Sequence, residues 1–352
     1  MATLPIEPDG AATQGRRPAW RERLPLRGRQ PRLGSADAPR KHQLSVAQRD
    51  SRTGLALISP TLIILLIAVV VPLLWSVLIS FQQLRLIQIG THNPFAPLTW
   101  NNYLLALRSG QLWASLRVTL LYTFGAVTLS TGLGLLAAIS LRRPFRGRGL
   151  VRASLLLPYV APIVAVTFVW RTALNPQFGI VNAIGQRWLG WEAPIAFLSQ
   201  TTFNWQIFGL TIPIPVALLS AIAFAGWRYF PFAYLFIMAR LEAMSGEQEE
   251  AAAVDGATRW QRYRYIVIPQ LVPILGVLIL LRTIWTFNDF DDIFLLTRGA
   301  GGTQVASVRM YELLTVQQNV GGAAAQSVVM SILLISMLLV YRFVLQRRGE
   351  KP

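Results

Sequence analysis

The sequence predicts an all-α membrane protein with six transmembrane helices, because its apolar residues gather in long blocks that carry almost no charge. Hydrophobic residues make up 53% of the 352 residues and charged residues only 14%, whereas soluble domains average roughly 25% charged residues. A helix needs about 20 residues to cross a hydrocarbon core about 30 Å thick. Blocks of that length lie at residues 55–81, 116–141, 153–173, 211–239, 265–287 and 323–345.

The segment ahead of the first block, residues 1–54, is rich in arginine, proline, glycine and glutamine and has few large apolar side chains. Such a composition buries too little surface to offset the entropy of ordering the chain. We therefore expect a disordered, basic cytoplasmic tail, followed by a transmembrane domain over residues 55–348. The first apolar block is too long for a cleavable signal peptide, and it lacks a small-residue cleavage site.

Basic residues are divided unequally between the two sides of this six-span topology. With the N-terminus inside, 24 lysines and arginines fall in the tail, the C-terminal segment and the loops at 142–152 and 240–264, whereas 6 fall on the opposite side. Cytoplasmic loops of membrane proteins are enriched in basic residues. The asymmetry predicts that both termini are cytoplasmic, and it accounts for the net charge of +17 without a nucleic-acid partner.

Several kinds of chemistry are excluded by residues that the sequence lacks. It has no cysteine, and His42 and His92 are its only histidines, so thiolate chemistry and a clustered imidazole metal site are excluded. Lys41 and Lys351 are the only lysines, and neither belongs to the glycine-rich phosphate loop of ATPases. We therefore expect no catalytic residue, no metal, no cofactor and no ATP hydrolysis by this chain.

The polar stretch near residues 242–264, between the fourth and fifth blocks, has the features of a helix that enters a cleft on a partner protein. Two adjacent alanines give a helix a narrow, flat face, and Glu250 beside them supplies a carboxylate for a basic residue of the partner. Gly256 lacks a Cβ, so the chain can turn there at low steric cost. We expect Asp255 to cap a second short helix, and Trp260 and Tyr263 to anchor that helix against the membrane segments.

This stretch resembles the EAA loop of ATP-binding-cassette (ABC) importer permeases: Glu-Ala-Ala, three residues, glycine, nine residues, isoleucine, one residue, an aliphatic residue and proline. The positions in register are Glu250, Ala251, Ala252, Gly256, Ile266 and Pro269. Ile268 stands where the family usually has leucine. The resemblance implies the type I ABC importer permease fold in a prokaryotic inner membrane. It assigns coupling to the ATPase to Glu250, Ala251, Ala252, Asp255 and Gly256.

Three further runs, at residues 170–182, 227–241 and 287–303, resemble the carbohydrate branch of these permeases, the maltose, trehalose and glycerol-phosphate type. Two local departures are Arg240, where glycine is usual, and Gly246, near the usual Ile-Pro pair. The C-terminus lacks the tail common in the second permease of such systems, so the chain is more similar to the first. The resemblance implies four kinds of partner: a second permease, two ATP-binding subunits, an extracytoplasmic solute-binding protein and a carbohydrate substrate.

Polar residues inside a membrane usually face a bundle interior or a pathway. Sugars are bound by planar polar groups and by aromatic rings, and the fourth span and the end of the fifth offer both. The candidate pathway residues are Trp227, Arg228, Trp285, Phe287, Asn288, Asp289 and Asp291. Alternatively, Arg228 and Arg282 pair with Asp289 or Asp291 to fix helix packing, or the acidic residues lie in water outside the membrane.

Two other functional classes remain open on the sequence alone. A secondary transporter or channel not driven by ATP would typically show internal repeats, and we find none. A membrane-embedded enzyme would need an activated nucleophile or a metal site, for which only carboxylates remain. Neighbouring genes for a second permease and a secreted solute-binding protein would favour import.

Overall fold

The computed structural model describes residues 46–91, 93–207 and 210–347, and the chain divides into two units, residues 1–63 and 64–352. The first 45 residues of the predicted tail lie outside the described residues. Helix α1 (Val46–Leu65) begins inside the predicted tail, so residues 46–54 are helical where a disordered segment was expected. The second unit holds the elements discussed below, except for residues 57–63 at the start of the first apolar stretch.

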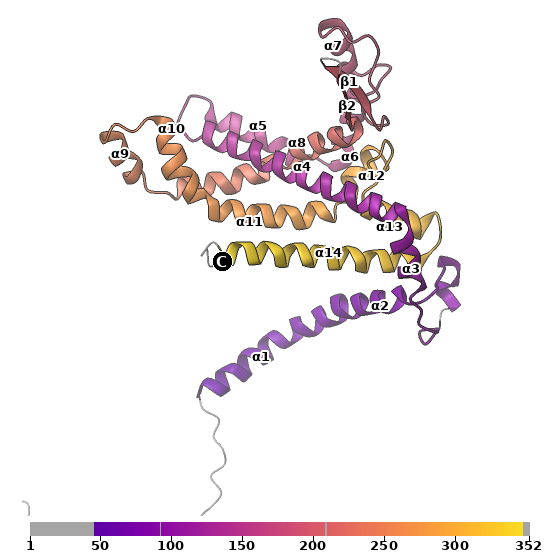
Figure 1. Cartoon of the computed structure of the whole chain (residues 1–352). Coiled ribbons are helices and arrows are strands. Elements are labelled where there is room, and N and C mark those ends of the chain that lie inside the picture. The colour runs from indigo at the N-terminus through magenta and orange to yellow at the C-terminus, as the bar shows by residue number, and fades with distance from the viewer. Residues whose placement is uncertain (1–45, 92, 208–209, 348–352) are drawn as a thin grey trace, which may run out of the picture. The chain divides into compact units, whose positions relative to one another are not determined.

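Most of the described chain is helical, and six of its segments match the six predicted blocks (Figure 1). Five are helical stretches long and apolar enough to cross a membrane: Leu57–Ser80, Gly110–Ser140, Val216–Glu242, Arg259–Phe287 and Val320–Phe343. The sixth is a pair of consecutive helices, α5 and α6, that together have the length and composition of a span. The prediction of an all-α membrane protein is confirmed, with five spans or six if the pair crosses.

The third block is broken, whereas the sequence predicted one span at residues 153–173. Helix α5 (Arg148–Val160) and helix α6 (Ile163–Ala173) meet at an angle of 94°. Pro162 lies at the break, and helical backbone geometry is disfavoured for the residue that precedes a proline. Ala161 accordingly adopts an extended conformation, with ψ at 142°.

The fourth block begins later than predicted, because residues 211–214 are extended. Strand β1 (Phe203–Ile207) pairs with strand β2 (Leu210–Ile214) in an antiparallel hairpin. Helix α8 (Val216–Glu242) starts directly after Pro215. A proline is tolerated at the start of a helix but disrupts its interior, so this proline fixes the boundary.

The second unit is organised around α8, which packs along α4 (Gly110–Ser140), while α11 (Ile268–Phe287) contacts both (Figure 1). Close approach of α4 to α8 depends on Gly134. A Cβ at that position would lie 2.5 Å from the Cβ of Ala233 and 2.8 Å from the backbone nitrogen of Tyr234. Small residues at helix contacts allow membrane helices to pack closely.

A second group of helices packs around α14 (Val320–Arg347), which contacts α2 (Val71–Ser80), α3 (Asn101–Arg108) and α13 (Ala306–Thr315). Arg309 joins α13 to two neighbours, because its guanidinium donates to Gln326 of α14 at 3.1 Å and to Gln111 of α4 at 2.6 Å.

The remaining elements are short. They are the π-helical turns at Leu66–Val70 and Tyr263–Val267, the 3-10 turn at Leu86–Thr91, α7 (Ile180–Trp188), α9 (Glu247–Val254), α10 (Arg259–Arg262) and α12 (Asp291–Leu296).

This order places the two groups of candidate residues at opposite ends of one helical span. The EAA segment, which we define as α9, the turn after it and α10, precedes α11 in the chain. The candidate pathway residues near Asn288 follow the end of α11.

Candidate functional site

The EAA segment presents its motif on an exposed helix. Glu250 and Ala251 are exposed on α9, and Ala252 beside them is half-buried. Among the described residues, Glu250 has neither an ion pair nor a side-chain hydrogen bond. Its carboxylate is therefore available to a group outside this chain.

The predicted turn at Gly256 is present and ends α9 in a defined motif. Gly256 is left-handed, with φ at +82°. Its amide donates to the carbonyl of Ala253 at 3.2 Å, and the amide of Ala257 donates to the carbonyl of Ala252 at 2.9 Å. This pair of bonds is a Schellman motif, in which a left-handed residue, usually glycine, satisfies the last carbonyls of a helix. A Cβ at Gly256 would meet no atom within 4 Å, so the backbone conformation, not crowding, selects glycine.

Two expectations for the second short helix were wrong. Asp255 does not cap it; that residue closes α9, and Thr258 caps α10 through a reciprocal capping box with Gln261. Trp260 does not anchor α10, because its side chain is 72% exposed. Tyr263, in contrast, does pack against the buried cluster that contains Val267.

A short ion pair ties α9 to the loop between α4 and α5. The guanidinium of Arg142 donates to both carboxylate oxygens of Glu249, at 2.6 and 2.9 Å. The two side chains are only 20% and 19% exposed. The hydrogen bond to Glu249 raises the pKa of Arg142 above its usual value. The neighbouring carboxylates of α9 therefore differ: Glu249 is paired with Arg142, whereas Glu250 has no partner among the described residues.

At the other end of α11, a buried charge cluster joins three spans to α12. Arg228 of α8 lies 3.9 Å from the carboxylate of Asp292, whose side chain is 1% exposed. Arg282 of α11 is buried and stacks on the ring of Tyr229, with its guanidinium carbon 4.0 Å from the ring centroid. The hydroxyl of Tyr122 in α4 donates to the carboxylate of Asp289 at 2.9 Å.

This cluster corrects the pairing that the sequence suggested. The partner of Arg228 is Asp292, not Asp289 or Asp291, and Asp291 is exposed. Sequence reasoning missed Asp292, although a usable signal existed. Asp289 lies before α12, and its carboxylate accepts a hydrogen bond from the backbone amide of Asp292 at 3.4 Å. The three-residue spacing allows this local contact between a side chain and the backbone.

The seven candidate pathway residues do not form one site. Phe287 is fully buried in a core cluster, and Trp227 packs on Trp170 at a centroid distance of 5.6 Å. Trp285 is half exposed and contacts Phe232. Asn288 alone of the seven lines a pocket of about 570 Å³.

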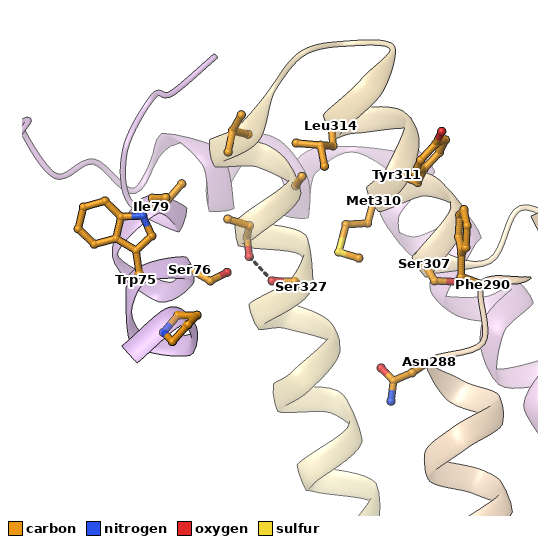
Figure 2. A pocket seen from close by; sticks show the side chains of 14 residues that line it. Trp75, Ser76, Ile79, Asn288, Phe290, Ser307, Met310, Tyr311, Leu314 and Ser327 are labelled. Carbon is orange, nitrogen blue, oxygen red and sulfur yellow. Dashed lines mark hydrogen bonds between the residues drawn. The ribbon is translucent and has the colours of Figure 1, made fainter. Parts of the chain in front are cut away.

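The pocket beside Asn288 lies between α2, α13 and α14 and mixes aromatic with hydroxyl side chains. Figure 2 shows Trp75, Ser76 and Ile79 on one wall and Met310 and Tyr311 on another. The full lining is Pro72, Trp75, Ser76, Ile79, Asn288, Phe290, Ser307, Met310, Tyr311, Leu314, Val320, Ala323, Ala324 and Ser327. Pockets for small organic ligands typically have about 300–1,000 Å³ and a few polar groups on a mostly apolar lining. The described residues contain no group of three or more acidic or histidine side chains arranged to hold a metal ion.

Known proteins resemble this chain in sequence and in fold. The family described as "Binding-protein-dependent transport system inner membrane component" matches residues 130–350. The inner membrane ABC transporter permease protein YcjO of Escherichia coli K12 is 32% identical over 315 residues, which cover 88% of this chain and 100% of that protein. The trehalose/maltose transport system permease protein MalF of Thermococcus litoralis is 31% identical over 297 residues, 83% of this chain and 93% of that protein.

A solved structure shows the same fold at lower identity. It is a crystal structure of a bacterial alginate ABC transporter in complex with alginate pentasaccharide-bound periplasmic protein. The matching chain is 22% identical and has a TM-score of 0.72, over 88% of this chain and 99% of that chain.

Proposed function

We propose that this chain, which belongs to the family of inner membrane components of binding-protein-dependent transport systems, is one of two permease subunits that form the pathway for ATP-driven carbohydrate uptake. The relatives' names support a carbohydrate, because one of them is a trehalose/maltose permease. The alternative of a transporter not driven by ATP leaves the EAA segment without a role. The proposal rests most directly on the exposed, unpaired Glu250 next to the small face of α9.

The geometry of the EAA segment supports docking into an ATP-binding subunit. Ala251 and Ala252 leave α9 narrow, and the carboxylate of Glu250 has no partner among the described residues. Arg142 holds the helix through its hydrogen bonds to Glu249. Charge-assisted hydrogen bonds of carboxylates to basic groups are among the stronger protein contacts. We therefore assign coupling to Glu250, Ala251 and Ala252, with Asp255 and Gly256 shaping the end of the helix.

The other partners follow from the same assignment. Two permeases, two ATP-binding subunits and an extracytoplasmic solute-binding protein would form the complete importer. Large apolar side chains stay exposed along the spans, among them Leu73, Phe124 and Ile335, and lipid and the second permease would cover them. The excess of basic residues in the loops supports cytoplasmic termini and a cytoplasmic EAA segment.

For the substrate pathway we retain Asn288 and place it in the pocket of about 570 Å³. The rings of Trp75 and Tyr311 provide apolar faces for sugar rings. The amide nitrogen of Asn288 donates to the carbonyl of Ile284 at 2.9 Å and the hydroxyl of Ser307 donates to the carbonyl of Asp289, so the oxygens of both side chains serve as acceptors for sugar hydroxyls. Phe287 is a packing residue because it is fully buried. Asp291 is exposed and does not line the pocket, so we do not expect it to contact substrate.

The test is transport by the reconstituted importer. The chain would be assembled in proteoliposomes with its co-encoded permease, ATP-binding subunits and binding protein, and uptake of a panel of disaccharides and polyol phosphates measured. We expect uptake of at least one carbohydrate that requires ATP. Carbohydrate uptake by the chain alone, without ATP, would show the alternative to be correct.

A paired variant tests the pocket. Asn288→Ala should change the apparent affinity for substrate or the order of preference in the panel, while the complex still assembles. Asp291→Asn, three residues along the chain, is the matched control and should transport normally. Equal effects of the two changes would remove Asn288 from the pathway.

A further inference from the structure

A basic pocket of about 220 Å³ lies between the α4–α5 loop and helices α9 and α10. Its walls hold four arginines and a single glutamate, which is an excess of three positive charges. The lining residues are Arg142, Arg143, Pro144, Glu249, Arg259, Arg262 and Tyr263. This pocket is separate from the exposed face of α9 that carries Glu250.

The glutamate in the pocket neutralises only one of the arginines. Both oxygens of Glu249 accept hydrogen bonds from Arg142. Arg143, Arg259 and Arg262 have no ion pair with any residue that the structure describes. Three guanidinium groups therefore converge on one small cavity, and no described residue supplies a counter-charge to them.

One of these groups is also partly buried without a hydrogen-bond acceptor. The Nε atom of Arg262 is inaccessible to solvent, and no described residue accepts its proton. A buried donor without an acceptor destabilises a fold. An anion with several oxygen atoms would supply the missing acceptor and the missing negative charge together, and guanidinium groups match phosphate geometry well.

The position of the pocket along the chain indicates where such an anion comes from. Arg259 and Arg262 stand at the first turn of the span Arg259–Phe287. Trp260 and Tyr265, on the same turns, are 72% and 71% exposed. Exposed tryptophan and tyrosine at the end of a span are typical of the level of the lipid headgroups. The pocket thus lies at headgroup depth.

We propose that this pocket binds the phosphate of an anionic phospholipid headgroup. Basic pockets between membrane helices on the cytoplasmic side are suited to acidic headgroups. That the pocket faces the cytoplasmic leaflet follows from the proposed cytoplasmic location of the EAA segment. Binding of the headgroup itself does not depend on the transport function. Because Glu249 and Arg259 line the same pocket, a bound headgroup contacts both helices of the EAA segment and holds them at the membrane surface.

Lipid binding by the purified full-length chain tests the proposal. Native mass spectrometry would measure the fraction of protein that retains dioleoyl-phosphatidylglycerol, with dioleoyl-phosphatidylcholine as the uncharged comparison. A partly exposed ion pair contributes up to about fivefold in affinity. Arg259→Gln with Arg262→Gln removes two such contacts to the phosphate and should weaken phosphatidylglycerol binding up to about 30-fold. Phosphatidylcholine binding should not change.

Two further variants guard against misfolding and against a general charge effect. Arg143→Gln changes an exposed loop residue that has no ion pair with a described residue. This variant should therefore fold normally, and the loss of one contact to the phosphate should weaken binding up to about fivefold. Arg264→Gln removes an exposed arginine at the same depth but outside the pocket, and it should bind as the unchanged protein does. Equal weakening by Arg264→Gln and Arg143→Gln would overturn the proposal.

Two other occupants give different results. If inorganic phosphate competes with phosphatidylglycerol at equal concentration, a soluble anion fills the pocket and the lipid assignment is wrong. If the change of Arg259 and Arg262 leaves lipid binding intact but weakens co-purification of the ATP-binding subunit, an acidic residue of that subunit is the occupant, and the proposal fails. Failure of uptake alone bears on neither result, because lipid binding is measured on the isolated chain.

Discussion

Replacing Glu249 with alanine removes both hydrogen bonds that tie α9 to Arg142. Replacing Glu250 with alanine removes no ion pair or side-chain hydrogen bond to a described residue. Charge-assisted hydrogen bonds contribute about 1.5–3 kcal/mol when shielded, and exposed ion pairs about 0.2–1 kcal/mol. The Arg142–Glu249 pair is about one-fifth exposed, so we expect it to stabilise the position of α9 by roughly 1–2 kcal/mol, an intermediate value.

Hydrogen exchange of the α9 amides measures this local stability. In Glu249→Ala the exchange should accelerate about 5- to 30-fold, the equivalent of 1–2 kcal/mol. Glu250→Ala should leave the exchange unchanged. A double-mutant cycle with Arg142→Ala should return a coupling energy of about 1–2 kcal/mol, since each single change removes the same pair.

Association with the ATP-binding subunit should be weakened more by Glu250→Ala than by Glu249→Ala, the reverse of their effects on hydrogen exchange. Glu250→Ala removes a carboxylate that is free to meet the partner, and we expect association about 10- to 150-fold weaker, from 1.5–3 kcal/mol for a desolvated contact. Glu249→Ala should weaken association less, and only through the looser helix. The reasoning would be refuted if Glu250→Ala accelerated exchange as much as Glu249→Ala, or if it left association unchanged.

Three further predictions concern the turn, the buried charges and the topology. Gly256→Val forces a β-branched residue to a φ of +82° and should abolish uptake while the protein reaches the membrane at normal levels. Asparagine tolerates this backbone conformation better, so Gly256→Asn should retain part of the uptake. Equal uptake by the two variants would contradict the backbone argument. Asp292→Asn leaves the Arg228 guanidinium without its counter-charge and should destabilise the purified protein by about 3–5 kcal/mol. The measurement is the midpoint temperature of thermal unfolding, which should fall. An unchanged midpoint would mean that the pair contributes no net stability. A reporter fused at Gln186 should lie outside the cell and one at Trp260 inside, and a cytoplasmic Gln186 reporter would overturn the six-span topology.

The helical fold and the turn of the EAA segment were predictable because both depend on local signals. The length of an apolar block is enough to predict a span, and the glycine at position 256 is enough to predict a turn. The true cap of α10 was also readable, since Thr258 and Gln261 have the spacing of a capping box. The break between α5 and α6 had a signal as well, in the Ala161–Pro162 step.

The contacts that assemble the site were not predictable in the same way. Arg142 and Glu249 are far apart in sequence, and nothing local distinguishes Glu249 from Glu250 beside it. Their difference arises only when the α4–α5 loop packs against α9. Phe287 likewise adjoins Asn288 in the chain, yet the helix turns one into the core and the other toward a pocket. Sequence pattern locates such residues but does not orient them.

The span that joins the two sites gives the proposed coupling a physical route. Arg259–Phe287 has 29 residues, which at 1.5 Å per residue is about 43 Å of helix, and it runs from the EAA segment to Asn288. The stack of Arg282 on Tyr229 links this span to α8, and α8 ends at Glu242, which pairs with Arg152 at 3.0 Å. We therefore expect a displacement of α9 to reach the pocket through these packed helices. Regular α-helical hydrogen bonding in this span is interrupted at the π-helical turn Tyr263–Val267, at Pro269 and at Pro273. We expect bending during transport to concentrate there.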